Sequence, residues 1–458
     1  MTALSTPARP RRRSLRSALA ITGFAALLAG TALSGSAGAS DADVAEQSAT
    51  IEGTTADGGV TRTGAGAAFD TQATSAAPML GVEGKGFGHG RGMGQWGALG
   101  YATAWKIPYP YILAHYYGGT TAARVDTNYD VRVRLGRFDD THLVLASDRG
   151  ALMTSVTGDQ RYQTVLVVPE RNGSWSVWAG SDCVGTWGWW YLTSSTQPVR
   201  FWVAGSNPAA EDQGQMVGTC ERDGSLRYYR GWMEVVRTQV GVRLVNSVPV
   251  EQYVRGVVPR EMPASWGDRE GPWGIQALAV QAVAARSYVL TEGRAPGFWH
   301  TCDSAACQVY GGAATWSASA GSRRLEDPRS DEAVFNTAGE VRLRPDGQIA
   351  RTEYSASTGG WTAGGSFPAV LDQGDPLPDN PNYLWHYDVS AQALQDEFPQ
   401  IGTLTRIDVT GRNGLGQWGG RATEVRLTGT NGTAVTDGDM VNFLLGLGTD
   451  WFEVTSIR

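Results

Sequence analysis

The chain has 458 residues, of which 41% are hydrophobic and 18% are charged, so it can bury the core of one large or two ordinary domains. Its formal charge is −7, and removal of the arginine-rich N-terminus described next takes that charge to −12. An acidic chain without a basic patch, and without a phosphate-cradling loop followed by Lys and Ser/Thr, argues against a nucleic-acid partner.

The N-terminus carries the pattern of an export signal. Five arginines between residues 9 and 16 precede an apolar stretch from Ala18 to about Leu33, and the small residues Ala37-Gly38-Ala39 follow. This order predicts a signal peptide over residues 1–39, whose removal leaves no transmembrane segment. The alternative is an uncleaved membrane anchor, although the apolar run is short for one. Residues 40–78 are rich in Ala, Gly, Thr and Ser and predict a disordered linker.

The first half of the remaining chain, residues 79–458, predicts mainly strands. Asp130–Leu145 alternates apolar and polar residues, which predicts a hairpin with its turn near Asp139-Asp140. A Trp- and Cys-rich insert of short strands is expected over about 150–235, and another strand over Val240–Val248.

Trp273–Leu290 is the main predicted helix, because Ile275, Leu278 and Ala282 lie along one face. Arg286 lies on or beside that Ala-rich face, and a buried guanidinium needs a carboxylate or a ligand. We expect an α+β fold that is strand-rich, with this one main helix and a few short ones. The shorter elements are strands near 350–355 and helices around 391–398 and 437–445.

Glu261 is the leading candidate for an acid/base. It stands between Pro259 and Pro263, which are expected to fix the backbone and to prevent a regular helix or central strand there. A carboxylate held rigidly among apolar residues is suited to a raised pKa, as a general acid at neutral pH requires. A surface glutamate in a turn is the alternative. Glu251 is a rival carboxylate in a strand-to-turn setting without flanking prolines.

The glycine-rich stretch Gly84–Ala98 would present His89 and Gln95 from a tight loop. Both side chains are candidates to bind substrate or to orient Glu261. A histidine that only hydrogen-bonds to backbone is the alternative. The glycine spacing differs from the dinucleotide-binding fingerprint.

Four cysteines in an exported chain favour two disulfides, and sequence order suggests Cys183–Cys220 and Cys302–Cys307 among three possible pairings. His300, Cys302 and Cys307 could instead hold zinc, but no fourth ligand stands nearby, so the disulfide is favoured and no metal is expected. Gln308, just after the second pair, is a further candidate for substrate binding.

Tyr354 and Ser357 belong to a run of hydroxyl residues that ends in the glycine pair Gly359-Gly360, a composition that can line a polar sugar groove. A serine hydrolase is not supported, because the Gly-x-Ser-x-Gly elbow is missing. A strand that leads into a turn is the structural alternative.

Together these segments resemble the SpoIID/LytB-domain family over most of residues 84–458. Characterised members are lytic transglycosylases that act on glycan strands stripped of stem peptides, and others are amidase enhancers. The resemblance implies a catalytic role for Glu261 and a supporting role for Arg286. It is carried by the segments NSVPVEQYVRGVVPREMPASW, QALAVQAVAARSYVL, CDSAACQVYGG, EYSASTGGWT, TGRNGLGQWGGRATEVRLTG and FLLGLGTDWFEV.

The chain departs from the family in two places. The Gly-His-Gly segment, which usually follows the closing strands, here precedes everything else at residues 84–98, together with Tyr109–Gly119. This order resembles a circular permutation, which is feasible where the domain's ends lie close together. Ala306 stands beside the second cysteine of the pair, where zinc-binding members carry a histidine, so the zinc implication weakens.

The resemblance therefore implies a secreted cell-wall enzyme that cleaves peptidoglycan glycan strands with one glutamate and leaves 1,6-anhydro-muramic ends. The rival hypothesis is a non-catalytic wall-binding protein that stimulates an amidase, for which the 17 tryptophans could form stacking surfaces.

Overall fold

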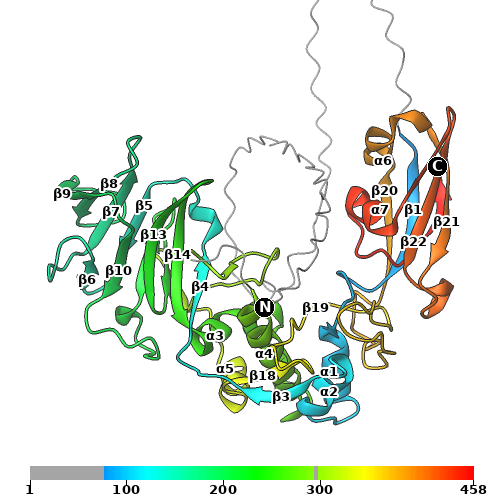
Figure 1. The fold of residues 1–458 in the computed structure, drawn as a ribbon, viewed down its shortest axis with the longest axis horizontal. Coiled ribbons are helices and arrows are strands. Elements are labelled where there is room, and N and C mark those ends of the chain that lie inside the picture. Colours follow the sequence, from blue (N-terminus) through cyan, green and yellow to red (C-terminus); the bar gives the residue numbers. More distant parts are fainter. Residues whose placement is uncertain (1–76, 293–297) are drawn as a thin grey trace, which may run out of the picture. The chain divides into compact units, whose positions relative to one another are not determined.

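A computed structural model describes residues 77–292 and 298–458 of the chain (Figure 1). The predicted signal peptide, and the predicted linker up to residue 76, lie outside the described residues. Within them the protein is rich in strands and has one long helix, which confirms the expected α+β class.

One antiparallel sheet is built around β14 (Gly241–Pro249), the strand predicted at 240–248. Alternate residues of β4, such as Val131 and Val133, are fully buried on its core side. The short β15 is the exception to the antiparallel order, because it runs parallel to β4. In spatial order the six strands are β15 (Thr301–Cys302), β4 (Asp130–Arg134), β14, β13 (Trp232–Thr238), β10 (Val199–Val203) and β6 (Leu152–Thr154).

A second sheet of eight strands contains most of the Trp- and Cys-rich region. Its inner face includes Trp175, Val177 and Ala179 of β8, all buried in the main core. In spatial order its strands are β17 (Gly321–Arg324), β16 (Ala314–Ser317), β12 (Leu226–Tyr229), β11 (Val217–Cys220), β5 (Leu143–Ala146), β7 (Thr164–Pro169), β8 (Trp175–Gly180) and β9 (Trp190–Ser195).

The hairpin predicted over 130–145 is wrong. Both strands form, but β4 joins the six-stranded sheet and β5 joins the eight-stranded sheet. A 3₁₀ turn over Gly136–Phe138 and a positive φ of 55° at Asp140 redirect the chain between them. Asp140 accepts a hydrogen bond from the Val242 amide, 2.7 Å away, which holds the redirected chain against β14.

The long helix α4 (Trp273–Thr291) confirms the predicted main helix. It is buried on nearly all sides, because its many alanines let the other helices approach closely. It packs against α1 (Gln95–Thr103), α2 (Tyr109–Tyr116), α3 (Val250–Glu261) and α5 (Pro328–Asn336), and also contacts β18 (Glu340–Leu343), which pairs with β3 (Thr121–Arg124).

The expectation that Pro259 prevents a helix before Glu261 is wrong, because α3 runs through Pro259 and ends at Glu261. A proline removes a single backbone donor, and the buried face formed by Val254, Val257 and Val258 continues past it. Pro263 does act as expected. It forces the preceding residue, Met262, into an extended conformation, and this stops the helix.

The ends of the described chain meet in one sheet. Strand β1 (Met79–Lys85) lies between β20 (Leu384–Ser390) and β24 (Phe452–Ile457), and in Figure 1 the blue β1 runs among orange and red elements. This adjacency is the arrangement that a circular permutation requires, and the permutation itself stays a prediction. A core of its own fills this region, with α6 (Gln392–Glu397), α7 (Gly438–Leu445), β21 (Leu404–Arg412), β22 (Ala422–Gly429) and β23 (Thr433–Thr436) around it.

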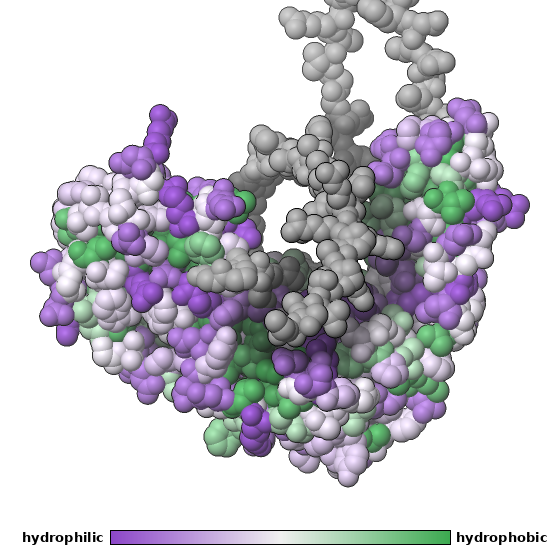
Figure 2. All heavy atoms as spheres, in the orientation of Figure 1, coloured by the Kyte–Doolittle hydropathy of each residue, from purple (hydrophilic) through white to green (hydrophobic). Residues whose placement is uncertain are grey.

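Among residues 77–292 and 298–458, no helix combines the length and the apolar character needed to cross a membrane. On the face shown in Figure 2, hydrophobic side chains form separate patches among hydrophilic ones.

Candidate active site

Glu261 lies at the C-terminal end of α3, and the residue as a whole is partly exposed. Its Oε1 accepts a hydrogen bond from the Val309 amide at 2.6 Å, and the Tyr354 hydroxyl also hydrogen-bonds to the carboxyl group. Burial raises the pKa of Glu261 to about 7, and these two hydrogen bonds only partly oppose that rise. Glu261 can therefore hold a proton near neutral pH and also release it.

Gln308 links the residues beside Glu261. Its Oε1 accepts from the Tyr253 hydroxyl at 3.0 Å, and its Nε2 donates to the Tyr354 hydroxyl, also at 3.0 Å. Because the Tyr354 oxygen accepts this bond, its own proton is free to point at the Glu261 carboxyl group. The side chain of Gln308 is buried, so here it orients Tyr354, and the predicted contact with substrate stays a prediction.

The glycine-rich segment Gly84–Ala98, far from Glu261 in sequence, also contacts the surroundings of Glu261. β2 (Met93–Gly94) pairs in parallel with β19 (Tyr354–Ser355), the only strand formed in the predicted 350–355 region. The Trp96 amide donates to the Ala356 carbonyl at 3.0 Å. Gln95 then donates from Nε2 to the backbone oxygen of Glu261 at 2.8 Å. Four motifs far apart in sequence therefore meet at Glu261.

His89 lies beside this strand pair and is exposed. Its Nδ1 accepts a hydrogen bond from the Arg91 amide at 3.0 Å, and the Arg91 side chain pairs with Glu353 at 3.2 Å. Desolvation of the ring, and next the charge of Arg91, lower the pKa of His89 to about 4. A neutral imidazole at the surface can hydrogen-bond to a sugar hydroxyl, which keeps the predicted substrate contact open.

Among the described residues, Arg286 forms no hydrogen bond or ion pair with Glu261. It is fully buried on α4 and forms a two-pronged ion pair with Glu251, at 2.8 Å for each bond. The Gly339 amide donates to the same carboxylate at 3.0 Å. The partner that a buried arginine requires is thus the rival glutamate. Arg286 can support catalysis by tying α3 to α4, and that role stays a prediction.

Ser357 is fully buried and donates to Asp375 at 2.7 Å, so its hydroxyl faces the interior. Asp375 and Asp372 form a buried acidic pair that sequence reasoning missed. The Thr358 hydroxyl donates to Asp372 at 2.8 Å. Burial, and for Asp372 the neighbouring Asp375 charge, raise the pKa of both carboxyl groups. No sequence signal beyond two acids in an apolar, proline-rich loop pointed to this pair.

Both predicted disulfides form, Cys183–Cys220 and Cys302–Cys307, each with sulfurs 2.06 Å apart. Zinc binds cysteine as a thiolate, so the oxidised sulfurs do not fit a zinc site in this form. His300 uses its Nδ1 to accept from the Arg132 amide at 3.1 Å. In the part of the chain that the structure describes, no group of three metal-binding side chains comes together.

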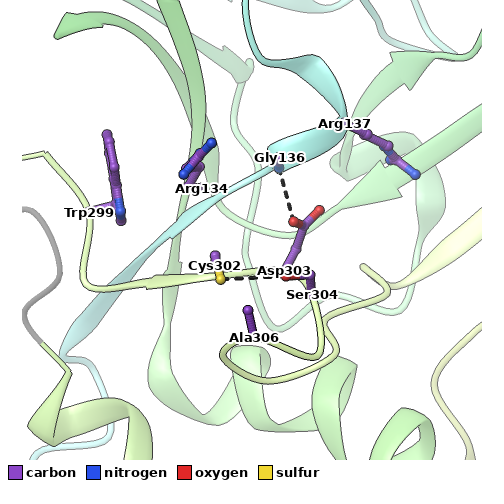
Figure 3. Close-up of a pocket in the computed structure, with 8 residues that line it drawn as sticks. All are labelled: Arg134, Gly136, Arg137, Trp299, Cys302, Asp303, Ser304 and Ala306. Atoms are coloured by element: carbon purple, nitrogen blue, oxygen red, sulfur yellow. Dashed lines mark hydrogen bonds between the residues drawn. The ribbon is translucent and has the colours of Figure 1, made fainter. Parts of the chain in front are cut away.

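A pocket of about 610 Å³ opens beside the second disulfide (Figure 3). Both of its arginines already have partners: Arg134 pairs with Asp139, and Arg137 pairs with Glu221 at 3.0 Å. Glu261 does not line this pocket. Its lining residues are Arg134, Gly136, Arg137, Trp299, Cys302, Asp303, Ser304 and Ala306. The acid/base candidate and this pocket are therefore separate features.

Residues 238–343 match the family model described as "Stage II sporulation protein", SpoIID. This segment contains Glu261, α4 and the Cys302–Cys307 loop. The chain is also 31% identical to the "Amidase enhancer" of Bacillus subtilis over 178 residues, which is 36% of this chain and 22% of that protein. It is 28% identical to an uncharacterized protein of Brachyspira hyodysenteriae over 144 residues, 30% of this chain and 33% of the other. The alignments thus span a third or less of either relative. Residues 238–343 are a SpoIID domain, and this match and the first relative support an assignment of the chain to the SpoIID/LytB-domain family.

Proposed function

We propose that this protein is an exported cell-wall enzyme that cleaves peptidoglycan glycan strands, with Glu261 as its single acid/base. The observation that carries this proposal is the setting of Glu261, a partly exposed residue whose carboxyl group has a pKa raised by burial to about 7. A general acid works best when its pKa lies near the working pH, because both protonation states are then accessible.

In the proposed reaction Glu261 first gives its proton to the glycosidic oxygen, and the bond from the anomeric carbon to that oxygen breaks. The 6-hydroxyl of the same muramic acid attacks the anomeric carbon, and its proton returns to Glu261. The net result is one proton moved between two sugar oxygens and a 1,6-anhydro ring. The substrate supplies the nucleophile, so the second carboxylate of an ordinary glycosidase is not needed.

Four other carboxylates that belong to the motif segments or hydrogen-bond to them are paired with arginine or buried, which supports a one-glutamate mechanism. Glu251 is matched by Arg286, and Glu353 by Arg91. Asp372 and Asp375 are buried, with at most 1% of either residue exposed, so they cannot reach a sugar. Tyr354 is placed to keep Glu261 aimed, because it hydrogen-bonds to both Glu261 and Gln308.

Export is part of the proposal. The signal-like N-terminus predicts passage through the membrane, and two disulfides suit an oxidising compartment. The amidase-enhancing name of one relative adds a cell-wall context and suggests an amidase as a partner.

That same name favours a second candidate function, a wall-binding protein that stimulates an amidase without cutting glycan. Exposed aromatic side chains in the strand-rich insert, Trp187, Trp190 and Tyr191, suit sugar stacking in either case.

Incubation of the purified protein with denuded glycan, followed by mass spectrometry, separates the two functions. We expect anhydro-muramic ends from the wild type and a loss of about 100-fold or more in Glu261→Gln. Glu332→Gln, which removes an exposed carboxylate on α5, is the matched control and should retain full activity. Uncut glycan, together with amidase stimulation that survives in Glu261→Gln, would establish the binding protein instead.

A further inference from the structure

The Glu-Met-Pro sequence leaves the backbone oxygen of Glu261 without a helical partner. Met262 is extended, with φ −126° and ψ 137°, so α3 stops at Glu261. The last carbonyls of a helix must find partners outside it. For Glu261 that partner is Nε2 of Gln95, at 2.8 Å and 166 residues away in sequence. Gln95 therefore caps the end of the helix that carries the acid/base.

Gln281 controls which end of the Gln95 amide faces Glu261. It lies on α4, is fully buried, and accepts at Oε1 from the same Nε2 of Gln95 at 3.2 Å. An amide nitrogen has two hydrogens, so one can go to Gln281 while the other goes to Glu261. Within the described residues Nε2 of Gln281 has no hydrogen-bond partner. Gln281 therefore contributes to this arrangement through its acceptor atom, Oε1.

The backbone that carries Gln95 is itself held in place. A Cβ on Gly97 would lie 2.1 Å from the Tyr116 hydroxyl and 2.3 Å from Asp372, so the first turn of α1 packs directly on the buried Asp372. On the other side, Met93 pairs with Tyr354. Gln95 and Tyr354 therefore belong to one assembly, and both of them bond to Glu261.

We propose that Gln281 and Gln95 form a positioning pair that fixes the end of α3 and so aims the Glu261 carboxyl group at the scissile bond. This inference rests on the proposed function. Neither residue is placed to touch substrate, because Gln281 is 0% exposed and Gln95 is 7% exposed. The pair acts through the backbone of Glu261.

The test compares two methionine variants with a variant that restores the acceptor. Gln95→Met removes both hydrogen bonds, and Gln281→Met removes only the acceptor, while each keeps the side-chain length. We expect kcat for denuded glycan to fall about 10- to 100-fold in Gln95→Met and several-fold in Gln281→Met, with KM nearly unchanged. Gln281→Glu keeps an acceptor oxygen, and because burial favours the neutral form of its carboxyl group, it should recover most of kcat.

The pH profile separates positioning from a general loss of stability. A loosened helix end admits water, so the pKa of Glu261 should fall toward its ordinary value in the methionine variants. Activity then declines at a lower pH than in the wild type. An unshifted profile in both variants would overturn the proposal, even if their activity fell. If Gln95→Met does not fold, Gln281→Met carries the test alone.

A wild type that leaves glycan uncut would refute the proposed function, and the positioning pair can then be tested without activity. Carbon-13 NMR follows the Glu261 carboxyl titration, with Glu261→Gln identifying its signal. A lower pKa in Gln281→Met supports positioning, and an unchanged pKa refutes it.

Discussion

Helix α3 carries a glutamate at each end. The two glutamates differ in their position on the helix dipole, in their charged partners and in their hydrogen bonds. Glu251 lies in the first turn, where the helix dipole favours negative charge, and it has Arg286 and the Gly339 amide as partners. Glu261 lies in the last turn, where the dipole disfavours negative charge, and no cation pairs with it among the described residues. The first glutamate is tied to a buried cation, whereas the second can be protonated near neutral pH.

This difference shows why a conspicuous glutamate is not enough to mark an active site. Both glutamates lie within the matched SpoIID segment, and one of them serves the fold. The acidic pair Asp372 and Asp375 makes the complementary point. Their pKa values are also raised, but they are buried from any substrate. A candidate acid needs both a raised pKa and access to a ligand.

The largest expected effect on stability comes from removing the ion-pair partner of Glu251. Arg286→Met leaves Glu251 without its cation beside a buried helix, and the loss of one partner of a buried pair costs about 3–5 kcal/mol of unfolding free energy. Denaturant unfolding measures this cost. The double variant Glu251→Gln, Arg286→Met should lose less, because it leaves no unpaired charge. A single-variant loss below about 1 kcal/mol would show that the pair contributes little to the fold.

A smaller effect is expected at the buried acidic pair. As pH rises above the ordinary aspartate value, an unfolded chain loses the Asp372 proton while the folded chain keeps it, so wild-type stability falls. Asp372→Asn cannot ionise, and its stability relative to the wild type should therefore improve by about 1–3 kcal/mol between pH 5 and pH 8.5. Thermal unfolding at the two pH values measures the change. A difference that is the same at both pH values would contradict the raised pKa.

Much of the architecture was readable from the chain, because periodicity and covalent chemistry are local. The apolar spacing of Ile275, Leu278 and Ala282 predicted α4, and cysteine order predicted both disulfides. The predicted hairpin over residues 130–145 was wrong because the alternation of apolar and polar residues predicts two strands, but not which sheet each strand joins. The helix through Pro259 was missed because burial of its valine face outweighs one lost hydrogen bond.

The residues of the candidate site could be predicted from the sequence more readily than the role of each residue. Four motifs were selected separately, and the structure brings residues of all four to Glu261. The link between Arg286 and Glu251 depends on how α3 and α4 pack, which no spacing within either helix encodes. Gln281 was overlooked because a single polar residue in an Ala-rich helix has the pattern of a solvent-facing position.

The central claim is that Glu261 is an acid poised near neutral pH, and direct titration of its carboxyl group by carbon-13 NMR tests that claim. The structure predicts a midpoint of about 7, well above the ordinary glutamate value of 4.5. A midpoint near 4.5 would contradict the claim, because Glu261 would then be ionised at neutral pH and unable to protonate a leaving group.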